Sequence, residues 1–495
     1  MKPRFRVYSS VAMMACALIL AGCTTLSPEA QTAALIAQAE AAMGSAALKT
    51  LTITGRGTGA SVGQSHAPGM PWPKLQLRAL SRSLNFETSS FREEFIHSRS
   101  EPLGGGAVPW MGGGESRGVV LAREAFAWDV VGVATVAAQA ALPERIHDLW
   151  TSTPQGAIKA AARHRARAGV RRDFLRRWDT LSFELPGQFS ATLVLEDNGL
   201  ISSIESKVPH ALLGQLPVLT RFLGYQSEAG LMLPSRIVQM QGGHPALDLQ
   251  LTDATANEAV EITVPDDVRV ATETVSVDKV ADGVWFLAGG THNSVAIEQA
   301  EQVVVVELPL HAARARAVLD AANQLVAGKQ ARTVINTHHH FDHAGGLRTA
   351  AAAGATIVTS ALARPYLEAA LGVSPASGAA ATTAAGRATG FVAVDGRAVL
   401  DDGSRPIEIH ELQGSRHARG LLAVWLPRER LLIQAGAYTP GAPDAQPPAV
   451  PDPNHLNLVQ NLERLGIVPR LILPLQGRVV PAADLYRQTG RSLPP

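Results

Sequence analysis

The feature that most constrains this chain is a cluster of four histidines and one aspartate within residues 338–343, directly after an apolar run. Residues 333–335 read Thr-Val-Ile, and a β-branched run of this kind predicts a buried strand. The cluster then lies on the loop that ends this strand, where α/β folds commonly place functional side chains. Gly345 and Gly346 allow a tight turn into the helix that Leu347 begins. The sequence therefore predicts a strand, a histidine-bearing loop and a helix in succession.

The side chains of this loop have the chemistry of a metal site. Zinc accepts neutral imidazole and carboxylate as ligands. His338 and His340 are two positions apart, and side chains alternate in an extended segment, so both point to the same side. His339 points the other way and is not expected to be a ligand. An incidental polar loop is the alternative, but the position directly after a strand argues against it.

The motif Thr-His-x-His-x-Asp-His-x-Gly-Gly at 337–346 resembles the signature of the metallo-β-lactamase superfamily at every fixed position. The resemblance covers about residues 275–495. It implies an αββα sandwich, in which two facing sheets are flanked by helices and the metal site lies at one sheet edge. It also implies that His417, which precedes an apolar strand over 421–425, completes the first metal site with His338 and His340. Three imidazoles leave a fourth position open, as in catalytic zinc sites.

The chain departs from the superfamily pattern at the second metal. The superfamily usually has a bridging aspartate where this chain has Gly436, or Ala437 one residue further on, and a last histidine where it has Gln476. Asp342, His343 and the amide of Gln476 would be the residual second site, which should hold zinc poorly. We therefore expect one zinc rather than two, with Asp342 acting as the general base that accepts a proton from water.

Four other side chains are candidates for a place near this pocket. Three of them, on or just after the Pro-rich loop 440–453, could reach the second site, although their spacing does not require it: Asp444, Asp452 and His455. The fourth, His292, lies in a turn that superfamily members place near the pocket. We expect it to be a structural loop histidine, as we do His410 in a predicted strand.

Residues 1–22 have the pattern of a bacterial signal peptide. A basic start precedes a short apolar stretch, and Leu-Ala-Gly-Cys over 20–23 resembles a lipoprotein box. The resemblance implies cleavage before Cys23 and a lipid on its thiol; an ordinary signal peptide with an incidental cysteine is the alternative. We expect a lipoprotein of the cell envelope, held by Cys23 in the outer membrane and facing the periplasm. Cys16 lies in the removed segment, so cysteine supplies neither a metal ligand nor a nucleophile.

The remainder of the chain divides into two regions of different pattern. After the anchor, residues 23–50 hold a helix that Ser27 caps and that runs to about Met43. Residues 51–272 predict a mostly antiparallel β domain, with strands that include 74–80, 191–195, 201–208 and 235–240. Residues 273–495 form the metallo-β-lactamase-like domain, so the predicted fold class is α+β. Low-complexity sequence at 373–390 predicts a surface loop.

Two functions are compatible with these observations. The preferred one is a lipid-anchored, zinc-dependent hydrolase in which a metal-bound water attacks the carbonyl of an ester, thioester, lactone or lactam. The other is a degenerate member that binds a ligand or an envelope partner without turnover. The residues Gly436 and Gln476 favour the second, and the complete first site favours the enzyme. Removing three basic residues with the signal peptide changes the formal charge from +1 to −2, so nucleic acid is not an expected partner. The sequence leaves the small-molecule substrate and the oligomeric state open.

Overall fold

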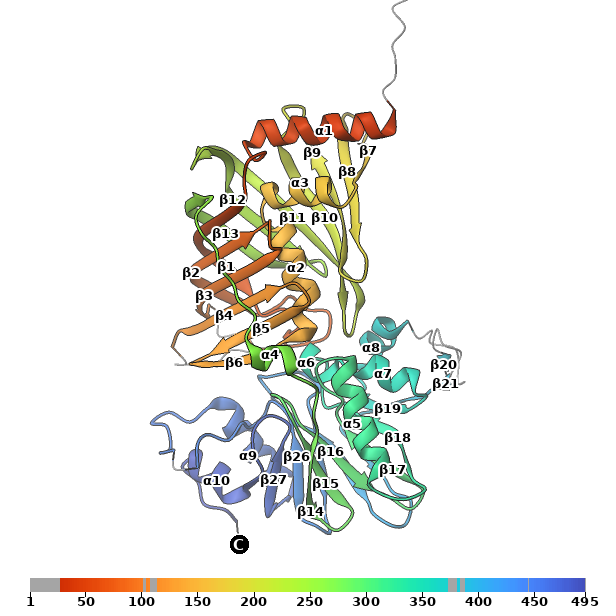
Figure 1. The fold of residues 1–495 in the computed structure, drawn as a ribbon. Coiled ribbons are helices and arrows are strands. Elements are labelled where there is room, and N and C mark those ends of the chain that lie inside the picture. The colour runs from red at the N-terminus through yellow and green to blue at the C-terminus, as the bar shows by residue number, and fades with distance from the viewer. Residues whose placement is uncertain are drawn as a thin grey trace, which may run out of the picture.

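The computed structural model describes residues 27–100, 104–106, 114–372, 381–382, 388–443 and 445–494. The expected signal peptide, Cys23 and Asp444 lie outside these residues, as does most of the low-complexity segment 373–390. The described chain forms an N-terminal half built on one large sheet and a C-terminal half built on two smaller sheets (Figure 1). None of the described helices combines the length and the apolar character that a membrane crossing needs.

Helix α1 (Pro28–Met43) opens the N-terminal half, and its bounds follow from local capping signals. Ser27 Oγ accepts a hydrogen bond from Ala30 N at 3.2 Å, and Gly44 ends the helix with a φ of 68°. A left-handed conformation at this position is what glycine adopts most readily. Leu35, Ala39 and Met43 form the buried face that packs on the core of this half.

A 13-stranded antiparallel sheet makes up most of the N-terminal half, in the order β6-β5-β4-β3-β2-β1-β13-β12-β11-β10-β9-β8-β7. The first strand pairs with the last, with Leu51 opposite Ala256, so the two ends of this region meet in the middle of the sheet. Its strands are β1 (Thr50–Ala60), β2 (Lys74–Asn85), β3 (Ser90–Arg99), β4 (Ser116–Arg123), β5 (Phe126–Val131), β6 (Ala134–Ala137), β7 (Arg167–Arg172), β8 (Arg177–Leu185), β9 (Phe189–Leu195), β10 (Ile201–His210), β11 (Gly214–Glu228), β12 (Leu231–Gln241) and β13 (His244–Ala256).

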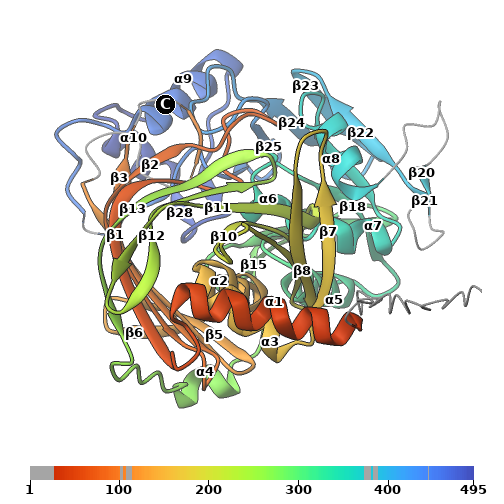
Figure 2. The same cartoon turned by 90° about the horizontal axis from the view of Figure 1, so that it is seen from above.

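The sheet curves around two helices, α2 (Leu142–Thr151) and α3 (Pro154–Arg163) (Figure 2). Each helix begins with a proline in its first turn, and Thr153 caps α3 by accepting from Gly156 N at 3.1 Å. Leu149, Trp150 and Ile158 are buried against the concave face of the sheet. A short helix, α4 (Asp266–Val270), lies in the connection to the C-terminal half.

The C-terminal half contains a seven-stranded sheet, β14-β15-β16-β17-β18-β19-β22, and a six-stranded sheet, β23 to β28 in order. The strands of the first are β14 (Ser276–Ala281), β15 (Val284–Ala288), β16 (Ser294–Glu298), β17 (Gln302–Val306), β18 (Gln330–Ile335), β19 (Thr356–Ser360) and β22 (Phe391–Val394). Those of the second are β23 (Arg397–Leu400), β24 (Ile407–Glu411), β25 (Leu422–Leu426), β26 (Leu431–Gln434), β27 (Leu471–Pro474) and β28 (Val480–Pro481). A separate pair, β20 (Ala381–Thr382) and β21 (Ala388–Thr389), completes the described strands.

The two sheets share a core of aliphatic side chains, including Val304, Ile335, Ile409 and Ile433. Helices α5 (Ala312–Gln324), α7 (Leu347–Ala352) and α8 (Arg364–Leu371) cover the first sheet, and α9 (Pro453–Leu465) and α10 (Ala482–Gln488) cover the second. The result is a helix–sheet–sheet–helix sandwich. It confirms the predicted α+β class, with a mostly antiparallel β region before the sandwich.

Strand β18 delivers the histidine loop to the edge of the sandwich. It pairs in parallel with β17 on one side and β19 on the other, so it is central and buried. The chain leaves it at Asn336 and enters the one-turn helix α6 (Phe341–Ala344). Figure 1 shows α6 at the junction of the two halves, which is where the candidate site lies.

Candidate metal centre

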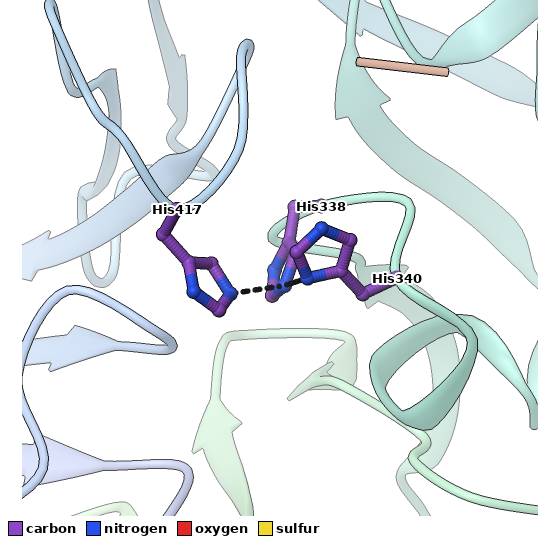
Figure 3. A group of neighbouring side chains, drawn as sticks. All are labelled: His338, His340 and His417. Atoms are coloured by element: carbon purple, nitrogen blue, oxygen red, sulfur yellow. Dashed lines mark hydrogen bonds between the residues drawn. The ribbon is translucent and has the colours of Figure 1, made fainter. Parts of the chain in front are cut away.

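Three imidazoles from two distant segments meet at this junction (Figure 3). His338 and His340 come from the loop after β18, and His417 comes from the loop between β24 and β25. His338 Nε2 lies 3.0 Å from His340 Nδ1 and 3.1 Å from His417 Nε2. One ring nitrogen from each of the three residues lies within 4.8 Å of the other two. These are three potential metal ligands directed at a common point.

The outer contacts of His338 and His340 fix which nitrogen carries the proton. His340 Nε2 donates to the carbonyl oxygen of Ser65 at 2.8 Å, which leaves Nδ1 as the nitrogen with a lone pair. Thr337 Oγ1 donates to Glu307, so it accepts from His338 Nδ1 at 2.9 Å, and Nε2 has the free lone pair. In both rings the lone pair therefore faces the cluster, as a metal ligand requires.

Electrostatics also keep these rings neutral. Burial, together with the neighbouring imidazoles, holds the pKa of His338 and of His340 well below the ordinary value. Burial and the nearby charge of His343 lower the pKa of His417 to about 3. The three rings are thus unprotonated at neutral pH, and imidazole binds metal only in that form.

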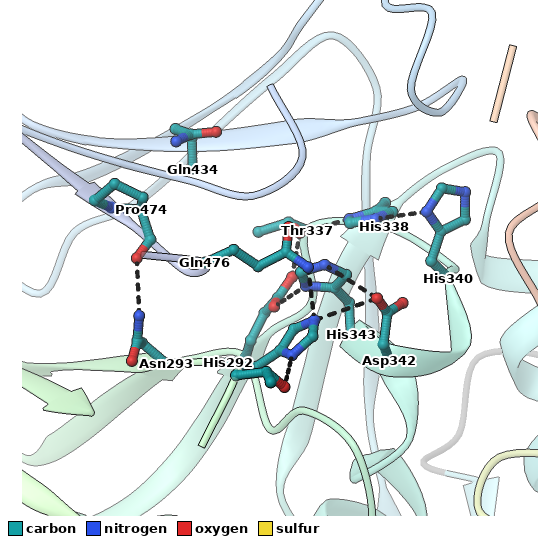
Figure 4. Close-up of polar contacts among 12 residues, drawn as sticks. His292, Asn293, Thr337, His338, His340, Asp342, His343, Gln434, Pro474 and Gln476 are labelled. Carbon is teal, nitrogen blue, oxygen red and sulfur yellow. Dashed lines mark hydrogen bonds and ion pairs between the residues drawn. The ribbon is translucent and has the colours of Figure 1, made fainter. Parts of the chain in front are cut away.

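A second group of ligand atoms lies beside the first and consists of His292, Asp342 and His343 (Figure 4). His292 Nε2 is 3.2 Å from Asp342 Oδ2, and His343 Nε2 is 3.9 Å from the same oxygen. His343 Nε2 is buried and has no hydrogen-bond partner, which is an uncommon state for a polar atom. Although burial raises the pKa of Asp342, the charge of His343 and the hydrogen bond with His292 hold it well below the ordinary range. The carboxylate is therefore ionised.

Glu307 lies next to both groups of ligand atoms, and it was not among the residues predicted from the sequence. Its fully buried carboxylate accepts from Thr337 Oγ1 and, at 2.5 Å, from His343 Nδ1. It thus orients His338 through Thr337 and His343 directly. Although burial alone would lower the pKa of His343, Glu307 and Asp342 raise it to about 9. The only local indication in the sequence was an acidic residue directly after the buried run Val303–Val306.

The N-terminal half also contributes to the site, through the loop after β1. Gln64 Nε2 donates to Asp342 Oδ1 at 2.8 Å, and Ser65 O accepts from both His339 Nε2 and His340 Nε2. Phe341 N donates to Gly63 O at 3.2 Å. These contacts join residues about 275 positions apart in the chain, and no local pattern indicates them. His339 therefore faces the N-terminal loop, and none of the three candidate ligand groups among the described residues includes it.

The two departures from the superfamily pattern have different structural consequences. Gln476 Nε2 lies 2.8 Å from His292 Nε2. The Gln476 amide therefore contacts a residue of the second group of ligand atoms and is not itself a member of that group. Gly436 has a φ of 67°, and a Cβ at this position would overlap His417 Nε2. The His417 ring occupies the space that a side chain at 436 would need. The chain therefore has room for the His417 ring because residue 436 is a glycine and not the aspartate of the superfamily pattern.

The remaining candidates from the sequence lie elsewhere. Asp452 caps α9, since its Oδ1 accepts from Asn454 N at 2.7 Å. The ring of His455 packs edge-on against Tyr438, and His410 Nε2 pairs with Glu408 at 2.9 Å. Of these further candidates, His292, which we expected to be structural, lies in the second group of ligand atoms with Asp342 and His343.

The chain is similar to known proteins over part of its length. The family model described as the metallo-beta-lactamase superfamily matches residues 287–433. None of the curated proteins compared with the sequence matches it. Similar solved structures include a metallo-beta-lactamase from Pontibacter korlensis, with 16% identity and a TM-score of 0.35, which covers 44% of this chain and 98% of its own. A metallo-beta-lactamase from Hirschia baltica has 18% identity and a TM-score of 0.34, covering 44% and 97%. The rubredoxin oxygen:oxidoreductase of Desulfovibrio gigas has 16% identity and a TM-score of 0.35, covering 43% and 61%.

The family match contains the whole histidine loop and His417, the residues that carried the resemblance in the sequence. It ends before Gln476 and begins after the large N-terminal sheet. The resemblance inferred from the motif is confirmed: residues 287–433 of this chain match the family model of the metallo-beta-lactamase superfamily.

Proposed function

We propose that this protein is a zinc-dependent hydrolase with two neighbouring cation sites. The observation that carries the proposal is the meeting of ring nitrogens from His338, His340 and His417, with the lone pairs of His338 and His340 facing inward. Neutral imidazole suits zinc, and three protein ligands leave a position open for substrate or water.

The second site would be held by His292, Asp342 and His343. Its support is the orphaned Nε2 of His343 beside an ionised carboxylate and a further imidazole. Because the pKa of His343 is raised to about 9, this ring carries a proton at neutral pH without a cation, and cation binding would release that proton. From the sequence we expected one zinc, with Gln476 as the poor remnant of the second site and Asp342 as the general base. His292 supplies the imidazole that this expectation lacked. A carboxylate whose pKa is well below the ordinary value is also a weak proton acceptor near neutral pH, so we assign Asp342 to the second cation.

Zinc held by these groups supplies Lewis acidity, which activates water near neutral pH and polarises a carbonyl group. The chain's own residues prepare the site for it. Glu307 and the Ser65 carbonyl orient the ligand rings, and Gln64 holds one oxygen of Asp342. Such outer contacts commonly change metal affinity by about 10- to 100-fold. In the proposed reaction, water adds to a carbonyl carbon, the bond to the leaving oxygen breaks, and the proton lost by water leaves on the alcohol.

The test combines metal analysis and hydrolysis on the purified chain. We expect about two zinc ions per chain, hydrolysis of p-nitrophenyl acetate, loss of activity with a chelator and recovery with zinc. His417→Ala should abolish activity, whereas His97→Ala, a histidine on β3 outside the site, should leave it intact. Zinc binding without hydrolysis of any ester, thioester, lactone or lactam would favour the alternative function, a ligand-binding protein. Absence of bound zinc would refute the proposal.

We also propose, from the sequence alone, that Cys23 carries a lipid that anchors the protein in the bacterial outer membrane. Mass spectrometry of the N-terminal peptide from the natural host tests this. A diacylglyceryl-modified cysteine is the expected result, and an unmodified or uncleaved N-terminus would contradict it.

A further inference from the structure

A large cavity lies between the two halves of the molecule and reaches the metal centre. Its volume is about 1130 Å³, slightly above the usual range for small-molecule sites. The N-terminal half contributes β6, α2 and the turn between β10 and β11. The C-terminal half contributes residues 310–313 before and within α5, and the start of α6. Both halves therefore build this cavity.

Asp342 joins the cavity to the metal centre. This residue lines the cavity, and its side chain is 26% exposed. Its two oxygens contact Gln64 Nε2 and His292 Nε2. A ligand that fills the cavity thus reaches the second group of metal ligands.

The walls indicate the chemistry of that ligand. Most lining residues are apolar, among them Val136, Leu216, Val218 and Phe341. No described residue of the lining is a lysine or an arginine, and three of them are carboxylates: Glu144, Glu273 and Asp342. Three histidines also line the cavity, but His147 is paired with Ser206, and burial lowers the pKa of His210 to about 4 and that of His311 below the ordinary value. A phosphate or carboxylate group would therefore find no lysine or arginine here and would meet like charge, which is unfavourable. An uncharged aliphatic chain fits both the shape and the polarity.

We propose that this cavity binds the aliphatic chain of the substrate, so that the substrate is an uncharged long-chain carboxylic ester with its carbonyl at the Asp342 end. The inference rests on the proposed hydrolase function and adds the substrate class. Hydrolysis breaks the acyl carbon–oxygen bond, adds the oxygen of water to the acyl carbon and returns a proton to the alcohol.

The hairpin of β5 and β6 offers a matched pair of variants. Val136 lines the cavity and is 43% exposed, whereas Val133, at the tip of the same hairpin, is fully exposed and does not line it. Val136→Glu adds charge to the wall, and Val133→Glu adds the same charge nearby without touching it. Neither position is buried, so neither change should prevent folding. Ala312→Trp, at the exposed first position of α5, reduces the cavity volume as an independent variant.

The first measurement is kcat/KM for p-nitrophenyl acetate, butyrate and octanoate. Burial of each added methylene should raise kcat/KM about fourfold, so octanoate, with four more methylenes than butyrate, should exceed it by roughly 250-fold. Val136→Glu and Ala312→Trp should reduce this ratio at least about tenfold, and Val133→Glu should not. Equal hydrolysis of all three esters would overturn the inference while leaving the hydrolase proposal intact.

The second measurement does not depend on catalysis. The neutral probe N-phenyl-1-naphthylamine should bind the chain and gain fluorescence, with or without zinc. Val136→Glu and Ala312→Trp should weaken its binding, and Val133→Glu should not. If no ester is hydrolysed but the probe behaves in this way, the cavity assignment stands and the hydrolase proposal fails. If the probe does not bind, or binds all variants equally, the cavity assignment is wrong.

Discussion

Replacement of Glu307 by glutamine tests how the chain positions its metal ligands. The side chain keeps its size and its buried place, but one of its two oxygens becomes an NH2 group. In the native chain, the Glu307 carboxylate accepts hydrogen bonds from both Thr337 Oγ1 and His343 Nδ1. An amide has only one oxygen, so it can accept one of these bonds and must direct a donor at the other. Either His343 or the Thr337–His338 pair loses its orientation.

The expected loss of zinc affinity can be estimated from these two hydrogen bonds. A hydrogen bond to a charged group contributes about 1.5–3 kcal/mol, and loss of an outer partner of a metal ligand usually weakens metal binding about 10- to 100-fold. We expect the zinc affinity of Glu307→Gln to fall by this factor, as measured by competition with a chromophoric chelator. Glu429→Gln is the matched control, since Glu429 is also largely buried and pairs with Arg405 at 3.0 Å, but outside the site. Unchanged zinc affinity in Glu307→Gln would refute the assigned role.

Three further changes test other parts of the account. His292→Ala should reduce bound zinc from about two ions to about one, whereas an unchanged zinc content would exclude His292 as a ligand. Gly436→Ala should weaken zinc binding because the new Cβ would displace the His417 ring. Gly466→Ala is the control, since Gly466 has a similar positive φ but open space around its Cβ position, and it should not weaken zinc binding. Equal effects of the two changes would point to backbone strain alone. His210→Asn should flatten the pH dependence of stability in urea unfolding. Burial and Arg348 lower the pKa of His210 to about 4, so the unfolded chain binds a proton that the folded chain does not, and stability falls as the pH drops from 6.5 towards 4. The loss should be about 2 kcal/mol at pH 5 and absent from the variant; an unchanged slope would contradict it.

The parts of the fold that sequence reasoning described well are those with local causes. Helix α1 was predictable because Ser27 and Pro28 mark its start and the Gly44-Ser45 pair marks its end, all in the local sequence. The strand β18 and the turn into α7 followed from a β-branched run and two glycines, whereas the one-turn helix α6 was not predicted. The meeting of His417 with His338 rested on the family resemblance, since nothing local joins residues 79 positions apart.

The parts that sequence reasoning did not describe depend on distant contacts. The pairing of β1 with β13 closes the large sheet across about 200 residues. Gln64 and Ser65 reach the metal centre only because that sheet packs on the sandwich. A lone histidine in a turn, such as His292, has no pattern that separates a ligand from a structural residue. Its role becomes visible only beside Asp342 and His343.

The central claim is that His338, His340 and His417 bind a cation together. Anomalous diffraction at the zinc edge, on crystals of the zinc-loaded chain, tests it most directly. We expect one strong peak among the three ring nitrogens and a second among His292, Asp342 and His343. Density with no peak between the three imidazoles, in crystals that retain zinc elsewhere, would contradict it.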